Sequence, residues 1–585
     1  MNDRTKQDPS RVVPTHDPLD MVMRYHQQTK HHFSRFARSL GYLDWANQPD
    51  PFRRYAGSPL FALPLLQHED APVSPPYEDL YRPGAIVSEA LSVRSLSRLL
   101  EYSLAVSAWK QAGEVRWALR CNPSSGNLHP TEAYLLVDDV AGLAPAAGLY
   151  HYAAKEHALE LRAQWSKEAF VRLLQGFPPK AFLVGFASVI WRETWKYGER
   201  AFRYCQHDVG HAIGSMRIAA QTLGWRMLLL GGLADDTVAA LLGVDRAEDF
   251  DGAEREHPDL IAVIWPSDQA ASPATGRMSY VPLSLAADAV SDVTRLTWRG
   301  KANRLSRDEP IQWEILDQVL VASWKSSKQQ SVVELRRERS SADPSGQATP
   351  VYAGQASAGQ VIRQRRSALA FDNTTSISAG RFFTMLTRVM PGVEHDLCLR
   401  AMPWDVLPWE PAVHLALFVH RVDGLVPGLY LLARDPLKVD ALREATHPQF
   451  EWMRAAGCPD DLPLFLLQEG DARALAAELS CRQDIAGESA FSLGMIAEFE
   501  SSLRQHGPWF YRRLFWETGL IGQVLYLEAE VAGVRATGIG CFFDDPVHQV
   551  MGFSGAKFQS LYHFTIGGPV EDPRLTTLPP YGLDH

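Results

Sequence analysis

The chain of 585 residues is too long for one ordinary core, because domains typically hold about 100–200 residues, so two or more domains are expected. Hydrophobic residues make up 46% and charged residues 22%, which is the balance of a folded globular protein and excludes a disordered or fibrous chain. The net charge of -10 argues against a basic surface that follows phosphates, so no nucleic-acid partner is expected.

Neither a membrane span nor a disulfide framework is predicted. No stretch approaches the roughly 18 consecutive apolar residues that cross a bilayer, and the polar start MNDRTKQDPS lacks the core of a secretory signal. We therefore expect a cytoplasmic protein. Without a C-x-x-C pair, the six cysteines are expected to be reduced and structural, and Cys541, alone after an apolar run, is interpreted as buried and inert. The six are Cys121, Cys205, Cys398, Cys458, Cys481 and Cys541.

Residues 1–59 are predicted to form an N-terminal helical segment. The run MVMRYHQQTKHHFSRFARSL has one apolar side when drawn as a helix, formed by Met21, Tyr25, Phe33 and Phe36. Neighbouring histidines on a helix point to different faces, so the histidines of this run are interpreted as surface residues and not as metal ligands. They are His26, His31 and His32. No metal site is expected elsewhere, because His207 and His211 are one helical turn apart but have no third ligand nearby.

The chain contains two copies of one unit. A gapless shift of 309 positions lays the segment from Arg200 to Asp236 over the segment from Trp509 to Asp545. The shift pairs Arg203 with Arg512, Asp208 with Glu517, Gly210 with Gly519, Gly224 with Gly533 and Arg226 with Arg535. Upstream, the run Gly-Leu-Tyr at 148–150 matches the same run at 428–430. We place unit one at residues 60–270 and unit two at residues 351–585.

Each unit is predicted to contain a long buried helix and a closing apolar strand. The helices are expected from Val209 to Leu223 and from Leu520 to Ala532, because these runs are apolar on most sides. The strands lie near residues 262 and 565. Between the units, residues 271–350 are predicted to be a connecting segment, and its end, ELRRERSSADPSGQATP, indicates a mobile surface linker. The predicted fold class is α+β, with helices around a mixed sheet.

Two short motifs have residue types suited to binding a phosphorylated, planar ligand. The loop Pro-Ser-Ser-Gly-Asn at 123–127 offers hydroxyl and amide groups beside backbone that can approach a ligand closely. The run Arg-Arg-Ser at 365–367 offers two guanidinium groups and a hydroxyl, expected at a helix start where free N–H groups also bind anions. Taken singly, an ordinary turn and a solvated basic face remain alternatives.

The motifs together resemble the nitroreductase superfamily. The runs at 122–132 and 365–371, Gly-Leu-Tyr at 148–150, Lys-Tyr-Gly at 196–198 and Gly-Ile-Gly-Cys at 538–541 occur in the expected order. They are most similar to the SagB-type branch, whose FMN-dependent dehydrogenases oxidise azolines to azoles in peptide natural products. The resemblance implies two tandem nitroreductase-like domains that form an intrachain pseudo-dimer, favouring a monomer.

The resemblance also implies FMN as the cofactor and assigns residues to it. Arg365, Arg366 and Ser367 resemble phosphate ligands, and Pro123, Ser124, Ser125 and Asn127 resemble the loop that a partner subunit contributes to the ring and ribityl chain. Gly538 and Gly540 resemble the turn whose backbone faces the ring near N5. Leu369 stands where the family often has a basic residue, and Arg574 is the expected substitute.

The two units have diverged in complementary ways. Unit one has the Pro-Ser-Ser-Gly-Asn loop without an Arg-Arg-Ser run, and unit two has the Arg-Arg-Ser run but reads LRAMPWDVLPWEP where the loop belongs. We therefore predict one composite site shared by the units. The related second site is expected to be empty or filled by side chains.

The expected activity is hydride transfer at flavin N5, with oxidation of an azoline or related bond in a small molecule or peptide. The resemblance implies that Lys196 and Tyr197 assist proton removal, and an exposed lysine beside a packing tyrosine remains the alternative. The sequence does not decide which of the two sites this pair faces. Two other functions stay open: NAD(P)H-dependent reduction of a nitro compound or quinone, and a flavin-free scaffold that binds a peptide or partner protein.

Overall fold

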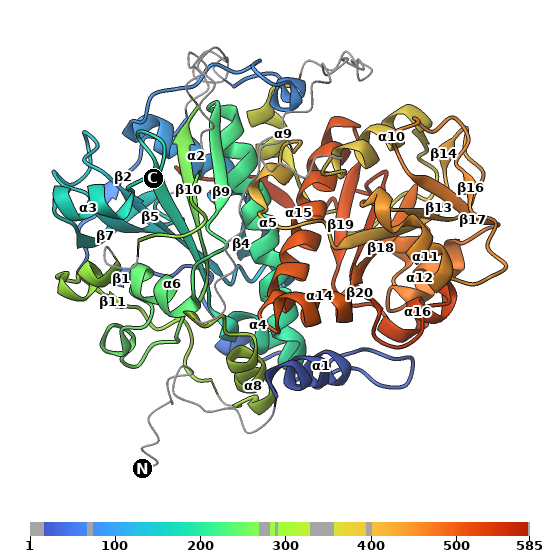
Figure 1. Ribbon diagram of the computed structural model, residues 1–585, viewed down its shortest axis with the longest axis horizontal. Coiled ribbons are helices and arrows are strands. Elements are labelled where there is room, and N and C mark those ends of the chain that lie inside the picture. Colours follow the sequence, from blue (N-terminus) through green and yellow to red (C-terminus); the bar gives the residue numbers. More distant parts are fainter. Residues whose placement is uncertain are drawn as a thin grey trace.

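The computed structural model describes residues 17–66, 74–267, 281–286, 290–309, 311–327, 356–392 and 400–582. Two seven-stranded sheets lie on either side of a central pair of helices (Figure 1). The main hydrophobic core surrounds these helices between the sheets, and a separate apolar cluster covers the outer side of each sheet. The α+β class with helices around the sheets is confirmed.

The two sheets have the same strand order. The first runs β2-β7-β6-β5-β8-β10-β9 and the second β16-β17-β15-β13-β18-β20-β19. The strands of the first are β2 (Leu60–Ala62), β5 (Thr131–Val137), β6 (Gly148–Ala153), β7 (Ala158–Gln164), β8 (Phe182–Ser188), β9 (Trp225–Leu229) and β10 (His257–Pro266). Those of the second are β13 (Val413–Val419), β15 (Gly428–Leu432), β16 (Met453–Arg454), β17 (Leu464–Glu469), β18 (Phe491–Glu498), β19 (Arg535–Ile539) and β20 (Phe558–Gly567).

Neighbouring strands in both sheets are antiparallel, where a mixed sheet was predicted. Strands β5, β6 and β7 follow one another along the chain with short connections. A parallel pair needs a crossover of a dozen or more residues, so such connections favour antiparallel pairing. The apolar runs predicted near residues 262 and 565 are the strands β10 and β20, each one strand in from an edge of its sheet.

The central helices are α5 (Ala201–Thr222) and α15 (Phe510–Val531), each of 22 residues. Both begin earlier than predicted, because ion pairs across the unit boundary bury the polar first turns. Arg203 contacts Asp544 at 2.8 Å, and the equivalent Arg512 contacts the equivalent Asp235 at 2.5 Å. The two contacts are the same interaction made in both directions, as in a two-fold symmetric interface.

The helices cross at a pair of glycines that the repeat places in register. A Cβ atom on Gly210 would lie 2.4 Å from the carbonyl oxygen of Trp516 and 2.8 Å from the Cα of Gly519. A Cβ on Gly519 would lie 2.2 Å from the carbonyl oxygen of His207. Only glycine at both positions lets the two backbones approach this closely.

We expect Gly210→Ala to lower the free energy of unfolding by a net of about 1–2 kcal/mol, because overpacking of about 1–3 kcal/mol outweighs the better helix propensity of alanine. Gly214→Ala is the matched control on the same helix. Its Cβ would meet the side chains of Leu520 and Gln523, which can move aside. Urea unfolding midpoints measure both variants. If Gly214→Ala lowered the free energy of unfolding as much as Gly210→Ala, backbone contact at the crossing would not be what requires glycine at Gly210.

The remaining elements surround the sheets or join the units. The helices are α1 (Pro18–Gln28), α2 (Val93–Ser103), α3 (Lys167–Leu173), α4 (Ile190–Tyr197), α6 (Asp235–Leu242), α8 (Glu314–Ala322), α9 (Ala358–Gln364), α10 (Ala379–Arg388), α11 (Val439–Ala445), α12 (Arg473–Leu479), α13 (Asp484–Gly487), α14 (Phe499–His506) and α16 (Asp544–Met551). Two short pairs are β1 (Tyr55–Ala56) with β11 (Lys301–Ala302), and β12 (Ile377–Ser378) with β14 (Val422–Asp423). Within the described ranges, no helix combines the length and apolar character needed to cross a membrane.

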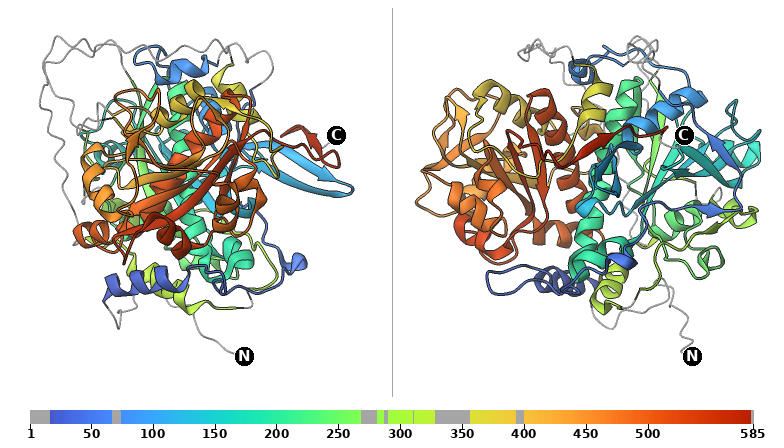
Figure 2. Two further views of the ribbon diagram at one scale, coloured as in Figure 1. Left: turned by 90° about the vertical axis from the view of Figure 1, so that its right-hand side faces the viewer. Right: turned by 180° about the vertical axis from the view of Figure 1, so that it is seen from behind.

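The end of unit two returns to unit one. Strand β21 (Thr576–Leu578) pairs with β3 (Val106–Ala112), which pairs in turn with β4 (Val115–Arg120). Figure 2 shows this hairpin projecting from the molecule with the C-terminal strand beside it. The hairpin leads directly into the loop at 123–127.

The N-terminal segment differs from the prediction. Helix α1 ends at Gln28, and His31 instead forms a bridge with Phe543 of unit two. The histidines predicted at the surface include His26 and His31, which are only 3% and 7% exposed. His26 is buried because its ring contacts the hydroxyl of Tyr511 at 3.2 Å. Sequence periodicity does not show that this segment packs across unit two.

The connecting segment is partly packed onto unit one. In residues 281–327, the described parts bury several apolar side chains against the outer core of unit one or beside α1. They are Val281, Leu283, Leu285, Val293, Trp313, Ile315, Leu316 and Val319. The run ELRRERSSADPSGQATP, predicted to be a surface linker, lies outside the described residues.

Candidate functional site

A buried arginine and a half-buried one, Arg365 and Arg366, lie where the two units meet. Arg365 directly follows α9, and only 4% of its surface is exposed. Its guanidinium donates a hydrogen bond of 3.0 Å to the carbonyl of Arg120, the last residue of β4 in unit one. Burial and the charge of Arg365 lower the pKa of Arg366 to about 10. Two like charges in a buried place repel each other, so this pair favours a bound anion.

Two further cationic side chains, Lys110 and Arg535, lie beside this pair, and neither belongs to a sequence motif. Burial lowers the pKa of Lys110 on β3, and the charges of Arg366 and Arg535 lower it further. Arg535, at the start of β19, also contacts Glu571 at 2.6 Å. The signal for Arg535 was its pairing with Arg226 in the repeat, whereas nothing in the sequence marks Lys110.

Ser367 lies in extended backbone, and not at a helix start as predicted. It forms a parallel bridge with Ala536, because the chain between α9 and α10 pairs with the free edge of β19. Its hydroxyl lies 2.9 Å from the hydroxyl of Tyr526. The amide of Gly538 donates to the same tyrosine oxygen at 2.9 Å. Tyr526 on α15 therefore joins the predicted phosphate residues to the glycine turn.

The loop Pro123–Asn127 is held by α5 and by the preceding hairpin. Asp208 on α5 accepts hydrogen bonds from the amide and from the hydroxyl of Ser125, each 2.9 Å long. The side-chain amide of Asn127 donates to the carbonyl of Ala118 at 2.8 Å. The loop thus has a fixed shape without any ligand.

Lys196 and Tyr197 lie against this loop. They end α4, and a Cβ on Gly126 would lie 2.7 Å from the hydroxyl of Tyr197 and 3.2 Å from Nζ of Lys196. The pair therefore packs directly on the loop of unit one. Burial raises the pKa of Tyr197 well above its ordinary value, so its phenol keeps its proton at neutral pH.

Aromatic side chains connect the loop to the glycine turn of unit two. The rings of Tyr197 and Tyr204 have centroids 4.2 Å apart. A Cβ on Gly540 would lie 2.0 Å from a ring carbon of Tyr204, and a Cβ on Gly538 would lie 1.9 Å from the hydroxyl of Tyr562. Glycine is required at both positions because these tyrosines lie directly on the backbone. The sequence motifs did not identify Tyr204, Tyr526 or Tyr562, which come from three separate elements.

Two buried carboxyl groups lie behind Tyr197. Burial raises the pKa of Asp208 to about 7, and burial together with Asp208 raises that of Glu193 well above its ordinary value. Neither carboxyl oxygen of Glu193 has a hydrogen-bond partner among the described residues. A carboxyl that titrates near neutral pH can exchange a proton with its surroundings. The site therefore contains proton carriers besides the predicted pair.

Arg574 is the predicted residue that the structure leaves outside this cluster. Its side chain is 84% exposed and pairs with Asp572 at 2.7 Å. The chain after Arg574 forms β21 and pairs with β3, so it does not fold over the arginines.

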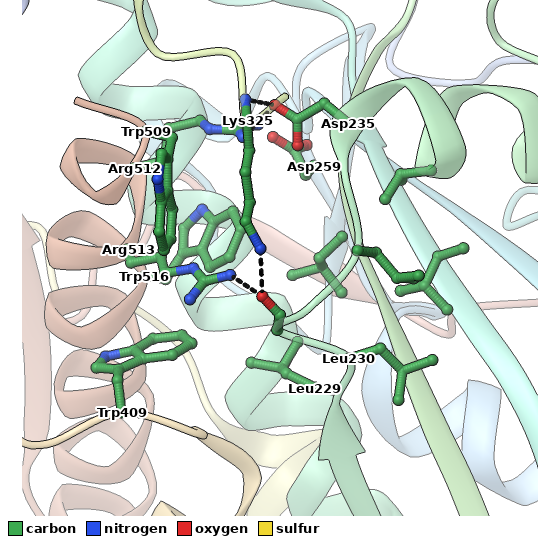
Figure 3. A pocket seen from close by; sticks show the side chains of 15 residues that line it. Leu229, Leu230, Asp235, Asp259, Lys325, Trp409, Trp509, Arg512, Arg513 and Trp516 are labelled. Carbon is green, nitrogen blue, oxygen red and sulfur yellow. Dashed lines mark hydrogen bonds and ion pairs between the residues drawn. The ribbon is translucent and has the colours of Figure 1, made fainter. Parts of the chain in front are cut away.

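The repeat gives the residues of this cluster counterparts on the other side of the crossing of α5 and α15. At these counterparts, called the second place below, lies a small pocket (Figure 3). In the repeat, Leu229 and Gly231 correspond to Gly538 and Gly540, and Arg513 corresponds to Tyr204. The guanidinium of Arg513 donates to the carbonyl of Gly231 at 2.9 Å.

Large side chains crowd this second place. Trp409 stands four residues before β13, as Asn127 stands four residues before β5. Trp409, Trp509 and Trp516 line the pocket together with Lys325 of the connecting segment, whose ammonium donates to Gly231 at 2.7 Å (Figure 3). The second site, expected to be empty or filled by side chains, corresponds to this pocket.

Comparisons with known proteins place one segment in a family. Residues 109–252 match the model described as "Nitroreductase family". A protein of Methanocaldococcus jannaschii named "Putative nitroreductase MJ1384" is 26% identical over 163 residues, which cover 27% of this chain and 77% of that protein. The "Trifolitoxin-processing protein TfxB" of Rhizobium leguminosarum bv. trifolii is 30% identical over 168 residues, 26% of this chain and 44% of that protein.

A solved structure extends the likeness of fold to nearly the whole chain. The crystal structure of a "putative nitroreductase" from Anabaena variabilis has a TM-score of 0.62 and 19% sequence identity. The match covers 94% of this chain and 99% of that one. The chain therefore contains a nitroreductase-family domain and has a nitroreductase-like fold along most of its length.

Proposed function

We propose that this protein is an FMN-dependent oxidoreductase with one flavin site built from both units. The contact between Arg365 and the carbonyl of Arg120 carries the proposal. It brings the basic residues of unit two to the strand that leads into the Pro-Ser-Ser-Gly-Asn loop of unit one. The units would be tandem domains, at residues 60–270 and 351–585, in an intrachain pseudo-dimer. Their equal strand order and the reciprocal contacts of α5 and α15 support this arrangement.

The residues present fit a flavin phosphate. The guanidinium groups of the buried Arg365 and the half-buried Arg366 repel each other, and the Nε proton of Arg365 has no partner among the described residues. A phosphate would accept from this proton and neutralise both charges, with the hydroxyl of Ser367 beside it. Lys110 and Arg535 would take the place that Arg574 was expected to fill.

The ring would lie between the loop of unit one and the turn at Gly538 and Gly540. Backbone amides and the side chains of Ser124 and Asn127 are the polar groups available there. Tyr204 and Tyr562 contact the two glycines and are the aromatic side chains available beside such a ring.

Bound FMN would supply hydride transfer, and this chain's own residues would handle the proton. The phenol of Tyr197, protonated at neutral pH, can donate a hydrogen bond to a substrate next to Gly126. Nζ of Lys196 lies at the same place and would be the second group in contact with the substrate. Asp208, whose pKa burial raises to about 7, lies behind the pair and can receive the proton.

The proposed substrate is an azoline or related heterocycle in a peptide, which the protein would oxidise. The 30% identity to a protein named for trifolitoxin processing supports a peptide substrate. The family match and the M. jannaschii relative favour the second candidate, NAD(P)H-dependent reduction of a nitro compound or quinone. Anaerobic mixing of the FMN-loaded protein with NADPH or with a thiazoline-containing model peptide separates these candidates by which one bleaches the flavin.

The first test is the ratio of flavin to protein after reconstitution with excess FMN and desalting. We expect one FMN per chain, because large side chains fill the second place. Two per chain would contradict the single composite site. No bound flavin would contradict the proposed function and favour the flavin-free scaffold.

A further inference from the structure

Two cysteines that lie 60 positions apart in the sequence meet beside the glycine turn. Cys541 directly follows Gly540, and Cys481 lies between α12 and α13. Their sulfur atoms are 2.7 Å apart, and both residues are partly exposed. A disulfide bond is about 2.05 Å long, so a small movement of either side chain joins the two. Cys541 is thus neither alone nor fully buried, contrary to the sequence interpretation.

The surroundings of Cys541 favour its thiolate form. The amide of Ala37 donates to Nδ1 of His31 at 2.9 Å, which leaves Nε2 of this ring to carry the proton of the neutral imidazole. Hydrogen bonds from Cys481 and His31, together with the charge of Arg200, lower the pKa of Cys541 to about 5. The same contact raises the pKa of Cys481.

The arrangement separates the roles of the two sulfur atoms. A reactive thiol is one that is ionised at neutral pH and open to solvent, and a neighbouring protonated thiol can then attack the product. The other described cysteines lack this environment. Cys121 and Cys205 are buried, and burial raises the pKa of Cys458 to about 11.

We propose that Cys541 and Cys481 form a thiol–disulfide exchange site that reduces low-molecular-weight disulfides of the glutathione class. Cys541 is the attacking sulfur and Cys481 the resolving sulfur. This assignment rests on the geometry of the pair and is independent of whether the protein binds FMN.

The exchange balances in two steps. The thiolate of Cys541 attacks one sulfur of the small disulfide, so the small S–S bond breaks, a mixed disulfide forms and one small thiolate leaves. Cys481 then loses its proton and attacks the sulfur of Cys541, which releases the second small thiol and forms the bond between Cys481 and Cys541. Starting from the thiolate of Cys541 and the thiol of Cys481, the protein pair loses two electrons and one proton, and the small disulfide becomes one thiolate and one thiol. Any excess dithiol reductant reverses the reaction.

The test uses oxidised glutathione as the probe and the full-length protein. After incubation, free thiols are blocked by alkylation and the digested protein is mapped by mass spectrometry. We expect a peptide cross-linked between Cys481 and Cys541 that disappears after treatment with dithiothreitol. Cys481→Ser should accumulate a glutathione adduct on Cys541, because no resolving sulfur remains. Cys458→Ser is the control and should still form the cross-link.

The pH dependence of alkylation gives a second, independent measurement. The charged and titratable groups around the pair are Cys481, His31, Arg200, Asp544, Tyr197 and Tyr204. A thiol with a pKa of about 5 is mostly ionised at pH 6, so alkylation of Cys541 should change less than about 2-fold between pH 6 and 8. Alkylation of Cys458 should rise roughly 100-fold over the same range. Alkylation of Cys541 that rises with pH as steeply as that of Cys458 would overturn the proposal.

The cross-link in the unmodified protein is the decisive result, because it requires no variant to fold. Its absence after incubation with oxidised glutathione would overturn the proposal, as would a Cys481→Ser variant that forms no adduct. Flavin content is measured separately, so loss of FMN binding and loss of thiol exchange are told apart.

Discussion

Arg365→Ala is expected to weaken FMN binding roughly 10–100-fold, because it removes a buried guanidinium with charge-assisted hydrogen bonds to the phosphate, each worth about 1.5–3 kcal/mol. Titration of the apoprotein with FMN measures the affinity, with quenching of the flavin fluorescence as the signal. The effect should be large because water has little access to this side chain, which is only 4% exposed.

The matched control is Arg574→Ala. This side chain is 84% exposed and paired with Asp572, so its loss should leave the affinity unchanged. Arg365→Lys keeps a charge but loses the planar fork, and we expect an intermediate affinity. Since Arg365 also contacts the carbonyl of Arg120 across the units, the thermal midpoint of each variant is compared with that of the unmodified protein. Unchanged FMN affinity in a folded Arg365→Ala variant would place the phosphate elsewhere.

Lys196→Ala and Tyr197→Phe are expected to slow reduction of the bound flavin by roughly 10²–10⁴-fold while FMN remains bound. This is the range over which a positioned proton-transfer group acts. The pair lies against the loop at Gly126, whereas the predicted phosphate residues lie near Arg120. The variants should therefore lower the rate of flavin reduction without lowering the affinity for FMN. Single-turnover mixing with the substrate that bleaches the flavin of the unmodified protein measures the rate.

The controls are Gln505→Ala and His506→Ala, at the equivalent positions of unit two. His506 packs near Trp509, which lines the pocket across the helix crossing, and Gln505 is exposed, so reduction should proceed at the rate of the unmodified protein. Normal rates in both Lys196→Ala and Tyr197→Phe would show that Lys196 and Tyr197 only pack against the loop. A parallel loss of FMN would show instead that the pair is part of the cofactor site.

The repeat made much of the fold predictable. Residues such as Gly210 and Gly519 recur at one fixed spacing because both units need the same close crossing of helices. Apolar runs likewise predicted the strands β10 and β20, since a strand with neighbours on both sides and packing on both faces is buried throughout. The starts of α5 and α15 were missed because their polar first turns are buried by ion pairs with the other unit.

Residues of the candidate site could be predicted only where they belong to a short run of residue types suited to one kind of ligand. Arg365 and Ser367 were identified from one short run, and their proximity to Tyr526 and Gly538 follows from packing. Lys110 was missed because a single lysine on a strand has no pattern. Arg574 was proposed from its charge alone, and the pairing of β21 with β3 takes it elsewhere.

The sequence by itself determined the α+β class with helices around sheets, and it predicted two related units with the expected binding residues divided between them. These features depend on local periodicity and on repeated spacing, which the chain displays directly. The tertiary structure alone decided that Lys196 lies against the loop at Gly126, that tryptophans line the pocket across the helix crossing and that Cys481 meets Cys541. Each depends on how distant segments cross, and no local pattern encodes the distance between them.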